Sequence, residues 1–186
     1  MEESSFVSIF ENISKNISDK TLIVKRKANL FYEIYLDTNL KVRNDEFSNP
    51  KRGNSAFQTD ICIFERKDSV EIPRIAIEFK TRLTTHDVLT YSAKAGKHKN
   101  IYHYLRYGLI ASDLNYIPGR FFTHNDHIDF IIAANNYKDR EKLSNLIDIL
   151  IKRELEISKT LEQIQFENKK YDYFQSNIIF KNFEDS

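Results

Sequence analysis

The sequence contains few of the residues on which several classes of functional site depend. Cys62 is the only cysteine among 186 residues, which excludes an internal disulfide and a cysteine-rich metal site. Four glycines leave little scope for a phosphate-binding loop, and neither that motif nor a nucleophile elbow occurs. Because disulfides are excluded and Met1 is not followed by a basic leader, we expect a cytoplasmic protein.

Long hydrophobic runs are also missing. No apolar segment approaches the roughly 18 residues that span a bilayer, so no membrane partner is expected. Hydrophobic residues make up 41% of the chain and charged residues 30%, a balance typical of globular domains. With no repeat or linker to divide it, the chain is predicted to form one domain over residues 1–186.

The net charge is only +1, so overall charge favours no particular partner. The distribution of charge is more informative. Residues 80–120 contain seven basic and two acidic side chains, and residues 20–54 contain eight and four. A localised basic surface is what a polyanion requires, and an ordinary solvated surface is the alternative interpretation.

Hydrophobic periodicity and turn residues predict an α/β fold, with a central mixed sheet flanked by helices and a long C-terminal helix. Thr21–Leu40 fits either a helix or a strand, and we favour the helix. The apolar tail at 171–186 is expected to pack onto the domain. The other expected elements are helices at 6–17, 86–97 (extending toward 105) and 138 to about 166, strands at 57–65, 75–80, 107–111 and 128–134, and loops at 44–55 and 118–119.

Two acids and a lysine lie in the strands expected at 57–65 and 75–80. The short connection favours an antiparallel hairpin, which would bring Asp60 and Glu78 together. Lys80 is two residues beyond Glu78 and therefore shares its face of the strand. Adjacent carboxylates repel each other, and a divalent cation such as Mg²⁺ relieves that repulsion. With a lysine, such a cluster suits phosphodiester hydrolysis by metal-activated water.

Asp60, followed after a hydrophobic run by the tripeptide Glu78–Lys80, resembles the motif of the PD-(D/E)XK nuclease superfamily. Type II restriction endonucleases are its best-known members. The resemblance covers about residues 28–134 and implies a restriction-endonuclease-like core that cleaves DNA. Thr59 replaces the proline that precedes the aspartate in the motif, a departure that many members tolerate.

The same resemblance implies roles for individual residues. Asp60 and Glu78 would hold Mg²⁺, for which Mn²⁺ could substitute, and the backbone carbonyl of Phe79 would be a further ligand. Lys80 would position the attacking water. Many members add a glutamate from an N-terminal helix, and Glu33 is the candidate here, with a plain surface glutamate as the alternative.

A stretch rich in basic and aromatic side chains follows the motif. Basic groups neutralise phosphates, and aromatic rings stack on bases or pack inward. We therefore predict DNA contacts from this stretch, with a solvated helix face as the alternative. Its members are Lys94, Lys97, His98, Lys99, Tyr102, Tyr104 and Arg106. Zinc is not predicted, because His124 and His127 lack a third ligand at a usual spacing.

The sequence thus predicts a Mg²⁺-dependent endonuclease, favouring a small type II restriction endonuclease that acts on double-stranded DNA. One active site per chain makes a homodimer the simplest way to cut both strands. The apolar stripe of the C-terminal helix would either form that dimer or pack on its own domain. The alternatives are a repair, junction-resolving or defence-associated nuclease of the same fold, and a non-catalytic nucleic-acid-binding module.

Overall fold

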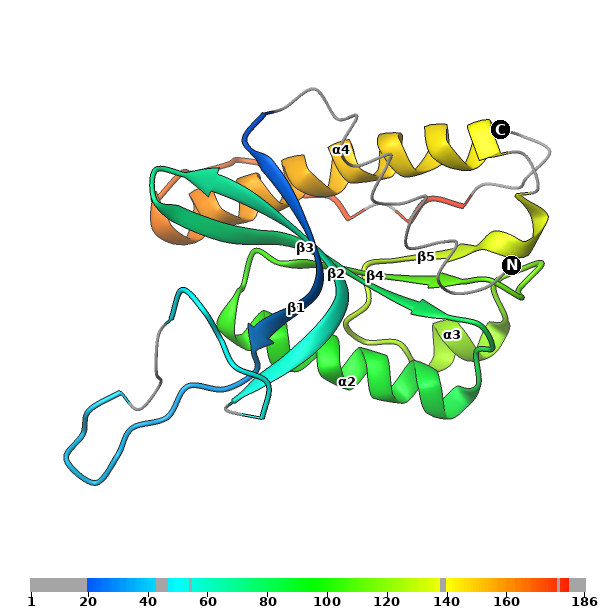
Figure 1. Ribbon diagram of the computed structural model, residues 1–186. Helices are drawn as coiled ribbons and strands as arrows, with labels where there is room; N and C mark the ends of the chain where they lie inside the picture. The colour runs from blue at the N-terminus through cyan, green and yellow to red at the C-terminus, as the bar shows by residue number, and fades with distance from the viewer. Residues whose placement is uncertain (1–19, 43–46, 54, 138–139, 177, 181–186) are drawn as a thin grey trace.

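A computed structural model describes residues 20–42, 47–53, 55–137, 140–176 and 178–180. Five strands form one mixed sheet in the order β1-β2-β3-β4-β5 (Figure 1). Pairing is antiparallel between β1, β2 and β3 and parallel between β3, β4 and β5. The elements are β1 (Leu22–Phe31), β2 (Ala56–Lys67), β3 (Val70–Lys80), α2 (Thr85–Ile101), β4 (Arg106–Ala111), α3 (Gly119–His124), β5 (Phe130–Ala133), a 3-10 turn (Ala134–Asn136) and α4 (Arg140–Phe166).

The expected hairpin is confirmed and is longer than the sequence suggested. β2 and β3 extend to the tight connection at residues 68–69, so most of the charged segment between the two expected strands is itself strand. Alternate β2 residues enter two different cores: Ile61 and Ile63 face one side of the sheet, and Cys62 faces the other. Both faces of the sheet are therefore covered.

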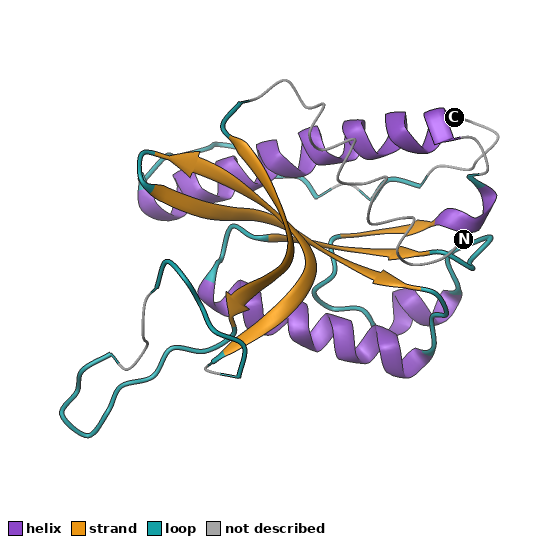
Figure 2. Cartoon of the chain, in the orientation of Figure 1, coloured by secondary structure: helices purple, strands orange, loops and turns teal. Residues whose placement is uncertain are grey.

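The long helix α4 covers the Ile61 face, and α2 and α3 cover the opposite face (Figure 2). The apolar stripe of α4, which includes Leu143, Ile147 and Leu155, is buried against this sheet. The stripe therefore packs on its own domain and is not a free dimer surface. Among the described residues, no helix has both the length and the apolar character needed to cross a bilayer.

The helix favoured for Thr21–Leu40 is wrong. Residues 22–31 form strand β1, which pairs with β2 over nearly its whole length, and the segment that follows is mostly loop. Without β1, the outer edge of the long strand β2 would have unpaired backbone groups. That tertiary requirement outweighs a weak local preference, and β-branched Ile23 and Val24 suit a strand.

Two further expectations concern the ends of the chain. The helix expected at 6–17 lies outside the described residues. The tail was expected to pack, but its described apolar side chains are exposed, Phe174 at 88% and Phe180 at 68%. A short helix was missed: Pro118, expected in a loop, precedes the first residue of α3.

Gly108 allows β4 and β5 to pack closely. It pairs with Phe130, and a Cβ added at Gly108 would lie 2.0 Å from the ring's Cζ. We expect Gly108→Ala to lower the free energy of unfolding by about 1–3 kcal/mol, because the ring must leave its place. Urea denaturation measures this effect. Gly119→Ala is the matched control, since its Cβ would meet nothing within 4 Å; equal losses in the two variants would contradict the prediction.

Candidate active site

The candidate site lies where β2 and β3 separate. The last pair of their antiparallel ladder joins Ile61 to Ile77. Beyond it, residues 78–80 continue beside β4, while residues 56–59 of β2 continue beside β1 (Figure 1). We call this point the fork. Backbone groups that face the fork need partners other than the opposite strand.

Asp60 supplies one such partner. Its Oδ2 accepts a hydrogen bond of 2.8 Å from the backbone N–H of Phe79, so a carboxylate replaces the missing ladder bond. On the other side, the β1–β2 ladder is interrupted between Lys27 and Asp60, and Lys27 has a φ of 50°. A positive φ in a residue other than glycine is strained, and such strain is concentrated at functional sites.

Glu78 is held more deeply, with only 3% of the residue exposed. Its Oε1 accepts hydrogen bonds from Lys94 Nζ at 2.7 Å and from the Tyr107 hydroxyl at 2.5 Å. Burial raises the pKa of Glu78 to about 7, and the charge of Asp60 adds to the rise, whereas Lys94 and Tyr107 oppose it. The hydrogen bond from Phe79 N–H to Asp60 also places Asp60 beside the backbone of the residue that follows Glu78.

In each of the two carboxylates, one oxygen accepts hydrogen bonds from the protein, and the second oxygen is the one that could bind a ligand. Asp60 Oδ1 and Glu78 Oε2 have no hydrogen-bond partner among the described residues. Two anchored carboxylates, each with an oxygen that accepts no hydrogen bond from the described residues, suit a hard divalent cation. Mg²⁺ in particular binds through one or two carboxylates and retains several waters.

The donor set consists of two carboxylates, not three. Within the described part of the chain, no three His, Cys, Asp or Glu side chains gather in a way that could hold a metal. Glu33, the expected third acid, follows the end of β1, is exposed and hydrogen-bonds with Tyr32. The structure therefore does not bring Glu33 to Asp60 and Glu78. The pair alone still meets the requirement of Mg²⁺.

No family model matches this chain, and no curated protein matches it. The function is therefore inferred from the positions of its side chains.

The two lysines near the acids differ in their partners, which changes the role expected of Lys80. Lys80 forms an ion pair of 3.2 Å with Asp87 at the start of α2, whereas Lys94, from the middle of α2, contacts Glu78.

Lys94 belongs to the stretch that was predicted to bind DNA. Three other side chains of that stretch also have partners within the domain. Lys99 pairs with Asp129 at 2.7 Å. Arg106 pairs with Asp129 at 2.8 Å and with Glu154 at 2.6 Å. The Tyr102 hydroxyl accepts a hydrogen bond from a backbone N–H of β1. These side chains join strands and helices of the domain, and their contact with DNA stays a prediction.

His98 and Lys97 differ from each other, although they are adjacent. His98 is fully buried, and burial, helped by the charge of Lys94, lowers its pKa to about 3. A neutral, buried ring cannot neutralise a phosphate. Lys97 is exposed, with its ammonium over the rings of Tyr32 and Phe57. Of the predicted stretch, Lys97 alone keeps an exposed cation.

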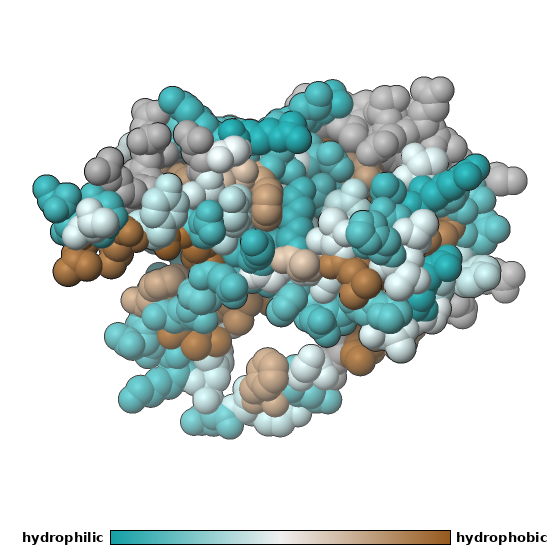
Figure 3. All heavy atoms as spheres, turned by 90° about the horizontal axis from the view of Figure 1, so that it is seen from below, coloured by the Kyte–Doolittle hydropathy of each residue, from teal (hydrophilic) through white to brown (hydrophobic). Residues whose placement is uncertain are grey.

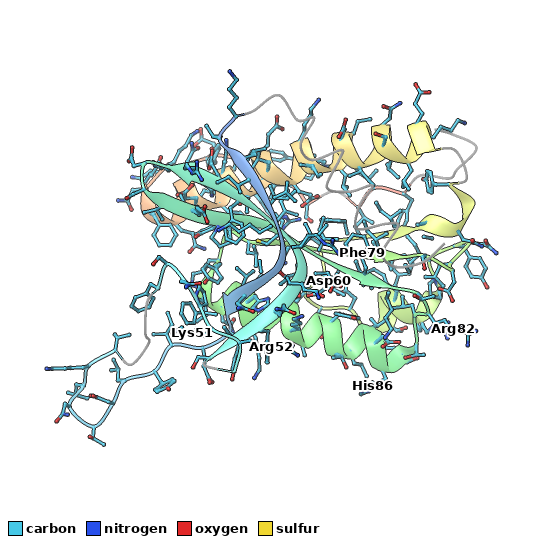
Figure 4. The ribbon with its side chains drawn as sticks, viewed as in Figure 1. Lys51, Arg52, Asp60, Phe79, Arg82 and His86 are labelled. Carbon is cyan, nitrogen blue, oxygen red and sulfur yellow. The ribbon has the colours of Figure 1, made fainter. Side chains whose placement is uncertain are left out.

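A different set of exposed basic side chains flanks the fork. Figure 4 places Lys51 and Arg52 on the loop before β2, and Arg82 and His86 near the start of α2, on either side of Asp60. Within the described chain, Lys51, Arg52 and Arg82 form no ion pair. Viewed from the α2 side, the surface is mainly hydrophilic (Figure 3). These residues lie in basic segments of the sequence, but the sequence does not indicate which cations have partners within the fold.

Proposed function

We propose that this chain is a Mg²⁺-dependent endonuclease of the PD-(D/E)XK type that hydrolyses DNA, and within that class a small restriction endonuclease. One observation carries the proposal: Asp60 and Glu78 stand at the fork, each anchored through one oxygen, with the other oxygen free. The order of the elements after the hairpin, a helix, two parallel strands and further helices, agrees with the core that the motif implies.

Asp60, Glu78 and the backbone carbonyl of Phe79 would hold the metal. When bound, Mg²⁺ lowers the pKa of a coordinated water and offsets charge on the phosphate. The protein's own contribution is to keep both carboxylates in place. Phe79 N–H fixes Asp60, and Lys94 and Tyr107 fix Glu78. Anchored ligands need no reorganisation during the reaction, which is the basis of electrostatic catalysis.

The reaction forms a bond from a water oxygen to phosphorus and breaks the bond from phosphorus to one ester oxygen. The water gives up its proton to solvent, and the departing oxygen takes one up, so the products are a phosphate monoester and a free hydroxyl. Negative charge grows on the phosphate oxygens between these events. A site that combines a divalent cation with a nearby ammonium stabilises that charge.

Incubation of the protein with mixed plasmid DNA in Mg²⁺, with EDTA as the control, tests the proposal. Discrete fragments are the result expected of a restriction endonuclease. Nicking or smearing that requires Mg²⁺ would retain the nuclease but replace restriction with a structure-directed or defence role. Intact DNA under all conditions would overturn catalysis and favour a binding module.

The exposed basic groups at the fork lead to a prediction about DNA affinity. We expect the double variant Arg52→Gln/Arg82→Gln to weaken duplex binding and to reduce the slope of log K against log salt by about 2. Each phosphate contact contributes roughly −0.9 to that slope. Fluorescence anisotropy measures it, with Ca²⁺ in place of Mg²⁺ so that the DNA stays intact.

The matched control is Lys152→Gln/Arg153→Gln. These two exposed cations lie on α4, which covers the opposite face of the sheet. The control removes the same charge, so it separates a local contact from a change in net charge. Equal slopes for the two double variants would show that DNA does not lie along the fork.

A further inference from the structure

The two lysines nearest the carboxylate pair have different partners, which gives a more specific assignment. We propose that Lys94 of α2, and not Lys80 of the strand motif, is the catalytic lysine that faces the reacting phosphate. The assignment rests on the proposed nuclease function. It names a residue that the sequence motif does not contain.

Lys80 has a partner of its own at the start of α2. Its ammonium pairs with Asp87 Oδ1 at 3.2 Å, and its side chain is 37% exposed. The other oxygen of Asp87 accepts hydrogen bonds from Thr84, which caps α2. These bonds, with the ammonium of Lys80, lower the pKa of Asp87 against the effect of burial, so this carboxylate stays ionised. Asp87 therefore retains Lys80 at the helix start.

Lys94 is directed into the fork. Its Nζ donates to Glu78 Oε1 at 2.7 Å and to the backbone carbonyl of Gln58 at 2.6 Å. Gln58 belongs to β2 and Glu78 to β3, so the ammonium joins the two strands beyond the point where they separate. Its side chain is only 18% exposed. A cation in this partly dry position acts more strongly on nearby charge than one in open solvent.

The hydrogen-bond capacity of Lys94 is not exhausted. An ammonium carries three N–H donors, and two acceptors are assigned here, so one donor remains. Asp60 Oδ1 and Glu78 Oε2, which accept no hydrogen bond from the described residues, belong to the two strands of the same fork. The third N–H can therefore donate to a phosphate oxygen held at these carboxylates. There it stabilises the charge that grows as the water oxygen bonds to phosphorus and the ester bond breaks.

The simpler alternative is that Lys94 only joins the strands and neutralises Glu78. Lys94→Met removes the charge, Lys94→Arg keeps a cation and donors, and Lys80→Met is the comparison. Tyr107→Phe is the structural control, because it removes another hydrogen bond to the same Glu78 oxygen without removing charge. For each variant, single-turnover cleavage in Mg²⁺, duplex affinity in Ca²⁺ and the unfolding temperature are measured.

We expect Lys94→Met to slow cleavage at least about 100-fold, a loss typical of removing a group that stabilises transition-state charge. Duplex affinity should change less than about threefold. Lys94→Arg should cleave at least about tenfold faster than Lys94→Met. Lys80→Met should cleave more slowly than wild type by less than about tenfold. The assignment is overturned if Lys80→Met is the slower variant, or if Tyr107→Phe slows cleavage as much as Lys94→Met does.

A second measurement does not depend on cleavage. Lysine acetylation of the wild-type protein, followed by mass spectrometry, is compared with and without duplex DNA in Ca²⁺. We expect DNA to protect Lys94 at least threefold and Lys80 less, while Lys152 on α4 stays unchanged. Absence of cleavage would end the proposed function by itself. Protection of Lys80 without Lys94, or of neither, would overturn the lysine assignment.

Discussion

Asp60→Asn is expected to reduce Mg²⁺-dependent cleavage of DNA by about 10³-fold or more, while the protein stays folded. Asparagine keeps an oxygen that can accept the hydrogen bond from Phe79 N–H, so the fork should retain its shape. What the variant loses is the negative charge that would hold the metal. Losses of this size are typical when one preorganised electrostatic contribution is removed from an active site. Single-turnover cleavage rates measure the effect.

The control for this variant is Glu156→Gln. Glu156 is an exposed acid on α4, on the opposite face of the sheet, so its neutralisation changes net charge equally without touching the fork. Duplex binding in Ca²⁺ should be near wild type for both variants, because a metal ligand stabilises the transition state more than the bound substrate. Wild-type cleavage by Asp60→Asn would remove Asp60 from the catalytic site.

The hairpin and the shared face of its two acids could be predicted because both depend on short-range rules. A short connection favours antiparallel pairing, and residues two apart in a strand share a face. The first rule puts Asp60 and Glu78 on adjacent strands. The same rules placed Lys80 on the correct face. They could not predict that Asp87, in the first turn of α2, would pair with its ammonium, because that contact depends on where α2 begins.

Strand β1 shows the limit of local patterns. Residues 22–31 carry both strand-forming and helix-compatible signals, and nothing within the segment indicates that the long edge of β2 requires a partner. The requirement arises only once β2 is known to be twelve residues long. The consequence extends to the site, since a helix would have presented Glu33 differently from the loop that follows β1.

Charge patterns were the least reliable guide to function. Lys99 and Arg106 look like exposed cations in the sequence, yet Asp129 and Glu154, which neutralise them, are 23 or more residues away. Long-range ion pairs leave no local signature. Arg52 and Arg82, which gave no stronger signal, form no ion pair among the described residues.

The buried carboxylate Glu78 makes the stability of the metal-free protein depend on pH. Its pKa rises from an ordinary 4.5 to about 7, mainly because burial disfavours the charged form. Below pH 4.5 the group is neutral in both the folded and unfolded chains. Between these values the folded protein holds a proton that the unfolded chain has released, so the contribution of Glu78 to the free energy of unfolding falls as pH rises. Above pH 7 that contribution is constant.

Glu78→Gln removes this contribution, so its stability relative to wild type should increase with pH. The difference between 4.5 and about 7 corresponds to about 3 kcal/mol. We therefore expect the variant to gain about that much on wild type between pH 4.5 and 7.5, in EDTA, even though it loses cleavage in Mg²⁺. Urea denaturation at several pH values measures the gain, and Glu156→Gln serves as the exposed control. A constant difference across this range would mean that folding does not perturb the pKa of Glu78, and a buried carboxylate would no longer distinguish the fork from an ordinary surface hairpin.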